Sequence, residues 1–250
     1  MSELKLRLKD IAMTFQTLET ETEAIHSFDL EVYKGEFVSI VGPSGCGKST
    51  ILNIIAGLVK PSHGQINVKG TIGYMFQRDH LFEWRTVLKN CLLGPEVQGH
   101  DLKNAYTNVI RLLETYGLKD FIHHYPNQLS GGMRQRVALI RTLAVNPDIL
   151  LLDEAFSALD YQTRIMVVDE VWNILRQEKK TAVIVTHDIA EAISMSDRIA
   201  VMSKRPSILK AVHKIELSQA GLSPLKNRSD EKFRSYFDLI WEELELNEAK

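Results

Sequence analysis

The residues most suited to chemistry form a segment with the spacing G-x-x-x-x-G-K-S. We call it the phosphate loop, and its members are Gly42, Pro43, Ser44, Gly45, Cys46, Gly47, Lys48, Ser49 and Thr50. Glycines at this spacing let the backbone curl, so that several N–H groups point at one anion. Lys48 is expected to reach the β- and γ-phosphates of a nucleotide, and the hydroxyl of Ser49 to ligate Mg²⁺. The segment therefore predicts the binding of a nucleoside triphosphate.

Two acidic residues follow a second apolar run. Asp153 and Glu154 come directly after residues 149–152, which are Ile-Leu-Leu-Leu. Ligands of a parallel sheet bind at the carboxyl ends of its strands, so we expect Asp153 beside the phosphate loop as a Mg²⁺ ligand. Glu154 is then placed to polarise an attacking water. The alternative is that both acids merely end a strand and cap the next segment, which the phosphate loop upstream disfavours.

Two isolated polar residues also follow apolar runs. Gln77 comes after residues 71–76, and His187 after residues 181–186. Either residue alone is more typical of a solvated or hydrogen-bonded structural position. Both strands are predicted to end at the sheet edge that carries Asp153, and this shared edge makes Gln77 and His187 candidates for the same site.

The elements that position these residues predict an α/β fold with a parallel core sheet. Residues 37–41 form an apolar strand before the phosphate loop, and residues 48–57 a helix after it. Residues 149–152 and 181–185 are apolar throughout, as strands buried on both faces are. A helix joins these two strands, with Asp160 as its expected N-cap.

The rest of the chain predicts two additions to this core. Residues 4–11 and 28–32 alternate apolar and polar positions, which indicates an N-terminal antiparallel β subdomain. Residues 65–68 and 71–76 are predicted as two further strands. Helical spacing marks residues 86–90, 102–116 and 133–145, which predicts an inserted α-helical subdomain at about 78–145. The Thr- and Glu-rich residues 17–23 are expected to lengthen the loop between the first strands.

The C-terminal tail, from about residue 205 to 250, is predicted to hold a strand (residues 208–217), a polar link and a helix. One face of that helix carries Phe233, Phe237, Ile240, Trp241 and Leu244. Such a stripe favours packing within the molecule over a regulatory or partner-binding role.

Composition limits the classes of protein that remain. The chain has 250 residues, and 30 Lys and Arg against 32 Asp and Glu give a net charge of −2. This balance provides no general attraction to nucleic acid, and no apolar run reaches the roughly 18 residues of a membrane span. Two cysteines, Cys46 and Cys91, are consistent with a reducing intracellular compartment. The N–H groups around Cys46 are expected to lower the pKa of its thiol, which would make it open to modification.

Residues 129–136, Leu-Ser-Gly-Gly-Met-Arg-Gln-Arg, begin a helix with a second N-terminus suited to an anion. With this segment the chain resembles the ATP-binding cassette (ABC) family, whose signature is LSGGQ-like; Met133 replaces the common Gln. The resemblance spans nearly the whole chain and implies one nucleotide-binding domain over residues 1–250. It identifies Phe15 as the adenine-stacking aromatic, residues 42–50 as Walker A, Gln77 as the Q-loop, residues 149–153 as Walker B, residues 157–160 as the D-loop, and His187 as the switch histidine.

The resemblance also implies a mechanism. Two cassettes pair head to tail as a homodimer, and Ser130, Gly131 and Gly132 of one subunit contact the ATP on the other. The implied catalytic residues are Lys48, Gln77, Glu154 and His187, and the implied Mg²⁺ ligands are Ser49, Gln77 and Asp153. Asp160 is expected at the nucleotide as part of the D-loop. The cofactors are then ATP and Mg²⁺.

Residues 74–77, 81–87 and 125–128 look like those of the nitrate, sulfonate and taurine importer ATPases. This implies ATP-driven uptake through separate membrane permease subunits and a solute-binding protein. The solute is then nitrate-, sulfonate- or taurine-like, or a thiamine-precursor pyrimidine. We expect the chain at the cytoplasmic face of the cell membrane, without nucleic acid as a partner. Phe82, Trp84 and Val87 are the candidate permease contacts, with ordinary subdomain core as their alternative.

Two other functions remain as alternatives. One is a soluble ABC ATPase that acts on nucleic acid or ribosomes, against which stand the single cassette and the lack of basic patches. The other is a regulatory cassette that binds ATP without hydrolysing it, against which stand Glu154 and His187.

Overall fold

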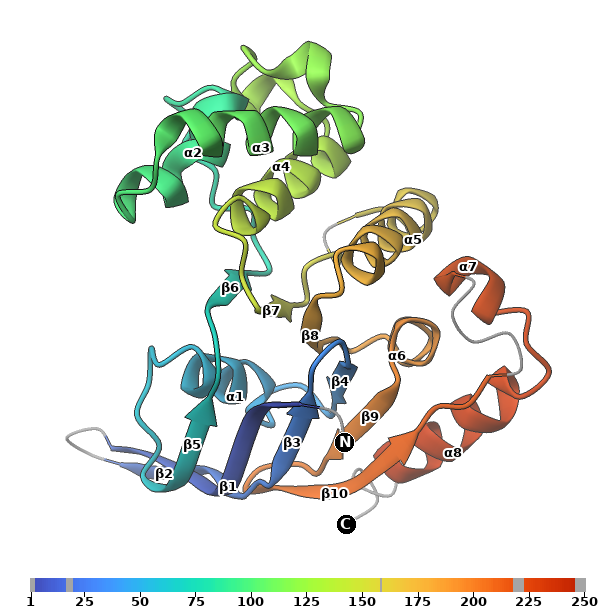
Figure 1. Cartoon of the computed structure of the whole chain (residues 1–250). Coiled ribbons are helices and arrows are strands. Elements are labelled where there is room, and N and C mark those ends of the chain that lie inside the picture. Colours follow the sequence, from blue (N-terminus) through green and yellow to red (C-terminus); the bar gives the residue numbers. More distant parts are fainter. Residues whose placement is uncertain (1–2, 17–19, 158, 218–222, 246–250) are drawn as a thin grey trace. The chain divides into compact units, whose positions relative to one another are not determined.

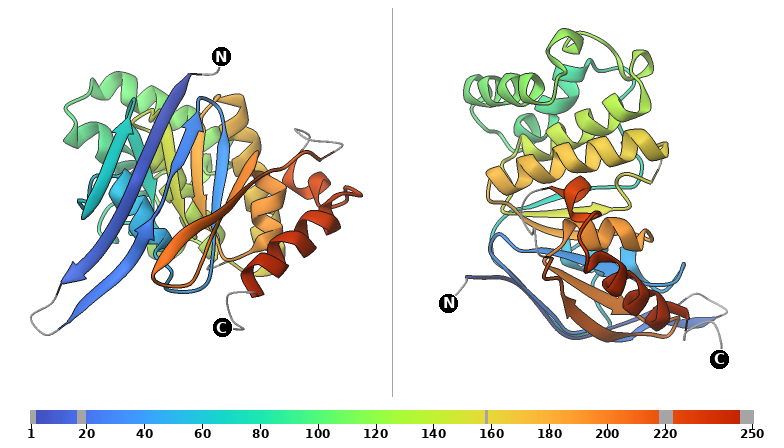
Figure 2. Two further views of the ribbon diagram at one scale, coloured as in Figure 1. Left: turned by 90° about the horizontal axis from the view of Figure 1, so that it is seen from below. Right: turned by 90° about the vertical axis from the view of Figure 1, so that its right-hand side faces the viewer.

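The computed structural model describes residues 3–16, 20–157, 159–217 and 223–245 (Figures 1 and 2). The chain divides into two compact units. The first unit consists of Met1–Gly70 and Asp169–Lys250, and the second of Thr71–Val168. The boundary falls within helix α5 (Tyr161–Gln177), and each unit has its own paired strands.

The sheet of the first unit has the strand order β3-β1-β2-β10-β9-β4-β8, and β5 also pairs with β1. Its strands are β1 (Leu4–Gln16), β2 (Glu21–Ser27), β3 (Leu30–Tyr33), β4 (Phe37–Val41), β5 (His63–Val68), β8 (Thr181–Val185), β9 (Arg198–Met202) and β10 (Ser207–Lys214). β4 is parallel to both β8 and β9, whereas β1 is antiparallel to β2, β3 and β5. The predicted parallel core with an antiparallel N-terminal region is thus present in this unit.

Burial explains why these strands differ in sequence. Every residue of β4 and of β8 is buried, which requires apolar side chains on both faces. In β1 the buried residues include Leu6 and Leu8, and Arg7 between them is exposed. The alternation of the first residues therefore reflects a strand with one covered face.

The helices of the first unit are α1 (Lys48–Ile55), α6 (Ile189–Met195), α7 (Pro224–Asn227) and α8 (Phe233–Glu245). In α8, Ile240 is fully buried in a cluster that includes Val41, Ile189 and Val201. Phe237 and Leu244 are partly buried against the same cluster, and α8 packs near β9 and β10, which are interior strands of the sheet (Figure 1). The predicted packing of the apolar stripe within the molecule is confirmed for Phe233, Phe237, Ile240 and Leu244, whereas Trp241 is 48% exposed.

The second unit has two parallel strands, β6 (Ile72–Met75) and β7 (Ile149–Asp153). Its helices before α5 are α2 (Val87–Val97), α3 (Leu102–Thr115) and α4 (Gly131–Leu143), and α2 packs against both α3 and α4. Each of these helices has a side-chain N-cap, from Thr86, Asp101 and Ser130 respectively. The helical segment expected at about 78–145 lies within this unit.

Three elements differ from the sequence prediction. Residues 17–23 were expected to lengthen a loop, but residues 21–23 belong to β2 (Glu21–Ser27), which is antiparallel to β1 and parallel to β10. Residues 17–19 lie outside the described part of the chain. α2 extends to Val97 through Pro95, well beyond the expected residue 90, and β9 was not predicted. In each case pairing or packing with distant residues outweighs the local pattern.

Within the described ranges, no helix is both long and apolar enough to cross a membrane.

Candidate nucleotide site

The phosphate loop joins the end of β4 to the start of α1. Gly45 has φ of 75° and Gly47 has φ of 104°, in the left-handed region where a side chain is strained. The Lys48 ammonium donates hydrogen bonds to the carbonyl oxygens of Gly42 at 2.8 Å and Pro43 at 3.0 Å. The loop therefore has the curled form that the sequence predicts, with the Lys48 ammonium bound to its first two carbonyls and the Cys46 N–H donating to the Pro43 carbonyl at 3.3 Å.

Cys46 differs from its prediction. Its side chain is 1% exposed, and burial raises the pKa of the thiol, although the charges of Lys48 and Arg205 act in the opposite direction. The expectation of a lowered pKa is wrong, because removal from water disfavours the thiolate more than the nearby cations favour it. Cys46 acts here as a small packing residue.

His187 lies between β8 and α6, exposed at the end of the strand. The next residue, Asp188, caps α6 by accepting a hydrogen bond from the Glu191 N–H at 3.0 Å. A pocket of about 240 Å³ brings His187 together with the first phosphate-loop residues and with α8; it is lined by Gly42, Pro43, Ser44, His187, Ile189, Trp241, Leu244 and Glu245. The first unit thus places His187 beside the loop. The sequence did not predict that residues of α8 would line this pocket.

Phe15 stands near the end of β1, opposite Thr22 of β2. Its side chain is 42% exposed, so part of the ring is available to a planar ligand. Its role in stacking on adenine stays a prediction.

Ser49 and Thr50 occupy the first turn of α1, and the exposed position of Ser49 suits a metal ligand.

In the second unit, Gln77 and Glu154 come together. Gln77 Nε2 donates to Glu154 Oε2 at 3.1 Å and to Ser157 Oγ at 3.5 Å. Glu154 has φ of 45°, a left-handed value that is uncommon for a residue with a side chain and is often found at functional sites. The acid is thus held in an unusual backbone conformation with an amide partner, which suits a group that must orient a water.

Asp153 ends β7 and is 8% exposed. The hydroxyl of Tyr74 donates to Asp153 Oδ2 at 3.3 Å, and the Tyr74 ring stacks on Phe76 with centroids 4.2 Å apart. Burial, reinforced by the Asp153 carboxylate, raises the pKa of Tyr74, so its hydroxyl keeps the proton that it donates. The sequence gives no sign that Tyr74 contacts Asp153, because this contact depends on the register of β6 against β7.

α4 begins at the predicted second anion-binding N-terminus. Ser130 Oγ accepts a weak hydrogen bond from the Met133 N–H at 3.4 Å, and Ser130 and Gly131 are exposed while Gly132 is buried. Asp160 caps α5, accepting from the Thr163 N–H at 3.1 Å, as predicted. Ala158, within the predicted D-loop, lies outside the described residues.

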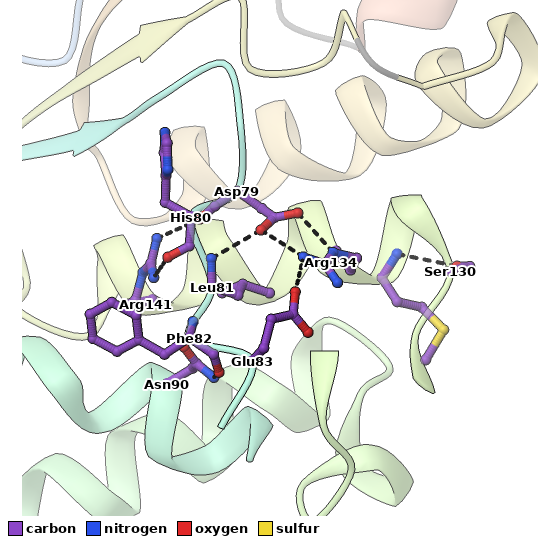
Figure 3. Close-up of polar contacts among 10 residues, drawn as sticks. Asp79, His80, Leu81, Phe82, Glu83, Asn90, Ser130, Arg134 and Arg141 are labelled. Atoms are coloured by element: carbon purple, nitrogen blue, oxygen red, sulfur yellow. Dashed lines mark hydrogen bonds and ion pairs between the residues drawn. The ribbon is translucent and has the colours of Figure 1, made fainter. Parts of the chain in front are cut away.

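Two arginines of α4 bind the segment that follows Gln77 (Figure 3). Arg134 Nε donates to Asp79 Oδ2 at 2.8 Å, and its NH2 group donates to Asp79 Oδ1 at 3.1 Å and to Glu83 at 2.8 Å. Arg141 donates to the carbonyl oxygens of Asp79 and His80. Burial favours a raised pKa for Asp79, but the hydrogen bonds from Arg134 and from the Leu81 N–H outweigh it and lower the pKa. The helix that begins at Ser130 and residues 79–83 are therefore joined by charge-assisted bonds.

The same segment carries two stacked aromatic rings. The centroids of Phe82 and Trp84 lie 4.8 Å apart with an interplanar angle of 10°, and Trp84 is 75% exposed. Asn90, fully buried, accepts from the Phe82 N–H and donates to the Phe82 carbonyl, which fixes the base of the stack. Val87 is fully buried at the start of α2, so its prediction as a surface contact is wrong. We call Phe82 and Trp84 the aromatic platform.

The predicted site residues thus form two groups. The phosphate loop, Phe15 and His187 belong to the first unit, and Gln77, Asp153, Glu154, Ser130 and Asp160 to the second. That the groups meet around one nucleotide stays a prediction. The donor set of Ser49, Gln77 and Asp153 consists of hydroxyl, amide and carboxylate oxygens, which fit Mg²⁺.

Comparisons with known proteins agree with these residues. A family model described as "ABC transporter" matches residues 25–157. The ABC transporter ATP-binding protein YtlC of Bacillus subtilis, itself uncharacterised, is 42% identical over 96% of this chain and 95% of its own length. The nitrate import ATP-binding protein NrtD of Synechocystis sp. is 36% identical over 95% of this chain and 94% of its own length.

A solved structure shows the same fold. It is the dimeric, post-hydrolysis state of an ATP-binding cassette bound to ADP and Pi. It matches with a TM-score of 0.74 and 33% identity, covering 84% of this chain and 99% of that one.

Proposed function

Because the chain belongs to the ATP-binding cassette (ABC) transporter family and is an ATPase of that family, we propose that it energises an importer as the subunit that hydrolyses ATP. The observation that carries this is the presence of two helix N-termini suited to phosphate, one at the phosphate loop and one at Ser130. One ATP occupies one phosphate loop, so the second N-terminus serves an ATP held by another copy of the chain. The solved cassette with ADP and Pi is itself dimeric, which supports a head-to-tail homodimer.

In this dimer each ATP lies between the phosphate loop of one subunit and Ser130, Gly131 and Gly132 of the partner subunit. Phe15 stacks on the adenine, and Asp160 of the D-loop lies at the same interface. The two subunits contribute to each site, so neither completes it alone.

Hydrolysis follows from the residues around the γ-phosphate. Glu154 orients a water and takes its proton as the water oxygen bonds to the γ-phosphorus, while the bond to the bridging β–γ oxygen breaks. Gln77 holds Glu154 in place. Lys48 and His187 stabilise the charge on the transferring phosphoryl group. Mg²⁺ held by Ser49, Gln77 and Asp153 supplies further neutralisation of the phosphate charge when bound.

The aromatic platform is the proposed contact with a membrane permease. An exposed tryptophan stacked on a second ring is the kind of anchor that buries well in a partner. The bonds of Arg134 and Arg141 to residues 79–83 connect this contact to the helix that begins at Ser130. Docking of the permease and binding of the partner subunit's ATP therefore both act on α4.

We further propose nitrate, a sulfonate such as taurine, or a thiamine-precursor pyrimidine as the solute, delivered by a separate binding protein. The similarity to a nitrate import protein supports the first class. In this assembly the chain lies at the cytoplasmic face of the membrane.

The test measures phosphate release from ATP by the purified full chain, alone and with its permease in vesicles that are offered each candidate solute. ATP-dependent release is expected, with loss in Lys48→Ala and a decrease of at least about 100-fold in Glu154→Gln. Stimulation by permease and transported solute supports the importer. Absence of hydrolysis, or stimulation by nucleic acid in place of the permease, contradicts the proposal.

A further inference from the structure

The phosphate loop is held from outside by the turn between β9 and β10. This turn, residues 203–206, is closed by a hydrogen bond from the Ser203 N–H to the Ile208 carbonyl at 3.0 Å, and by one from the Ile208 N–H to Ser203 Oγ at 2.9 Å. The residues at both ends of the turn are fully buried, Met202 and Ser207. The turn is therefore a fixed structure on which a side chain can be positioned.

Arg205, in this turn, reaches the middle of the loop. Its Nε and NH2 groups donate to the carbonyl oxygen of Gly45 at 3.2 and 2.7 Å. A β-carbon at Gly45 would lie 3.6 Å from the same NH2 group. A cation thus lies directly against the segment that is predicted to surround the phosphates.

The ends of the turn contact the rest of the loop. A β-carbon at Gly42 would lie 2.8 Å from Sγ of Cys46 and 3.0 Å from Cβ of Met202, so a side chain there would force these neighbours to shift. Ser207 Oγ donates to the Ala24 carbonyl at 3.1 Å, and the neighbouring Ile25 lies 3.1 Å from where a β-carbon at Gly47 would be. Gly42 thus lies against Met202 at the end of β9, Gly45 against Arg205 of the turn, and Gly47 against Ile25 of β2. The Ser207 hydroxyl after the turn bonds to β2 next to Ile25.

The charge of Arg205 is not neutralised locally. Among the residues that the structure describes, no carboxylate pairs with it, and its guanidinium is exposed. Its charge also acts inside the loop, where it opposes the rise that burial causes in the pKa of Cys46. The carbonyl that it binds shares a peptide unit with the Cys46 N–H, and a cation on that oxygen makes the N–H a stronger donor.

We propose that Arg205 is a positioning residue of the nucleotide site, which holds the phosphate loop through Gly45 and raises its affinity for nucleotide phosphates. This inference rests on the proposed ATP binding. It assigns to residue 205 a function that the motif residues alone do not contain. Lys48 supports the loop from within, through Gly42 and Pro43, and Arg205 supports it from outside.

The experiment compares nucleotide affinities of the purified full chain and three variants. Arg205→Gln removes the charge, Arg205→Lys keeps the charge without the planar fork, and Arg234→Gln removes an equal charge from α8, where the guanidinium pairs with Asp238. ATP, ADP and adenosine are titrated against a fluorescent ATP analogue, and thermal melting confirms folding. Steady-state hydrolysis then separates KM from kcat.

Arg205→Gln is expected to weaken ATP and ADP binding about tenfold, and Arg205→Lys about threefold, with adenosine and Arg234→Gln within twofold of wild type. KM for ATP rises and kcat changes less than twofold, because Arg205 acts through the loop and not on the reacting atoms. ATP affinity in Arg205→Gln within twofold of wild type overturns the inference. Equal losses for ATP and adenosine also overturn it, because they indicate a general disruption. If the wild-type chain binds no ATP, the proposed function itself is at fault.

Discussion

Nε2 of Gln77 donates a hydrogen bond to Oε2 of Glu154 at 3.1 Å, joining a residue that follows β6 to one that follows β7. Both residues belong to the second unit, so this contact with the acid is made within that unit, where Asp153 precedes Glu154 in the chain. The left-handed backbone of Glu154, with φ of 45°, adds a conformational constraint to this contact. The relation between these two side chains is the basis of the first prediction.

Gln77→Ala is expected to lower kcat for ATP hydrolysis about tenfold or more, with KM for ATP changed less than threefold. The amide orients Glu154, and a general base that is misplaced loses most of its contribution. Steady-state phosphate release measures both constants. Gln98→Ala, which removes an exposed glutamine from the end of α2, serves as the control and should behave as wild type. An unchanged kcat in Gln77→Ala would mean that the hydrogen bond has no part in hydrolysis.

Glu154→Gln is expected to stop turnover and to accumulate an ATP-bound dimer. The substitution keeps the shape of the side chain and removes its ability to accept a proton, so ATP remains between the two subunits. Size-exclusion chromatography with light scattering, in ATP and Mg²⁺, measures the mass. Lys48→Ala combined with Glu154→Gln should remain monomeric because the phosphate loop is impaired. A monomer at all ATP concentrations for Glu154→Gln alone contradicts the head-to-tail site.

Trp84→Ala is expected to leave basal ATP hydrolysis within twofold and to weaken binding to the permease at least about tenfold. The indole is 75% exposed and stacks on Phe82, so its removal leaves the fold intact but takes away a large apolar anchor. Tyr106→Ala, which removes another exposed ring from α3, is the matched control. Affinity for the permease in vesicles is the measurement. Full transport by Trp84→Ala would exclude the aromatic platform as the contact.

Cys91 is expected to make stability depend on alkaline pH. Burial raises the pKa of its thiol to about 12, so the folded state keeps the proton that the unfolded chain loses above a pH of about 8.5. A raised pKa in the folded state contributes stability that is complete below the unfolded value and is lost as pH rises towards the folded one. The free energy of unfolding should fall by up to about 1.4 kcal/mol per pH unit in this range.

The measurement is urea unfolding of the wild type and of Cys91→Ala between pH 7.5 and 10.5. The variant loses stability at all pH values because a buried side chain is shortened, but the additional alkaline slope should disappear from it. Parallel pH profiles for the two proteins would show that Cys91 is not responsible for the alkaline loss.

The sequence alone determined the local elements of the site. The phosphate loop lies between an apolar strand and a helix, α4 begins after Ser130, and Asp153 ends β7, as the spacing predicts. These features depend on glycine positions, caps and strands buried on both faces, all of which act over a few residues. The pattern also identified Gln77 and His187 as strand ends, although nothing within the strands shows which groups they contact.

Only the tertiary structure decided which distant residues complete these elements. Arg205 meets Gly45 across 160 positions, and Tyr74 meets Asp153 across 79. Trp84 is exposed while Val87, three residues later, is fully buried, although both are large apolar residues of one segment. Such contacts depend on strand register and on the packing of remote elements, which the local periodicity of the chain does not encode.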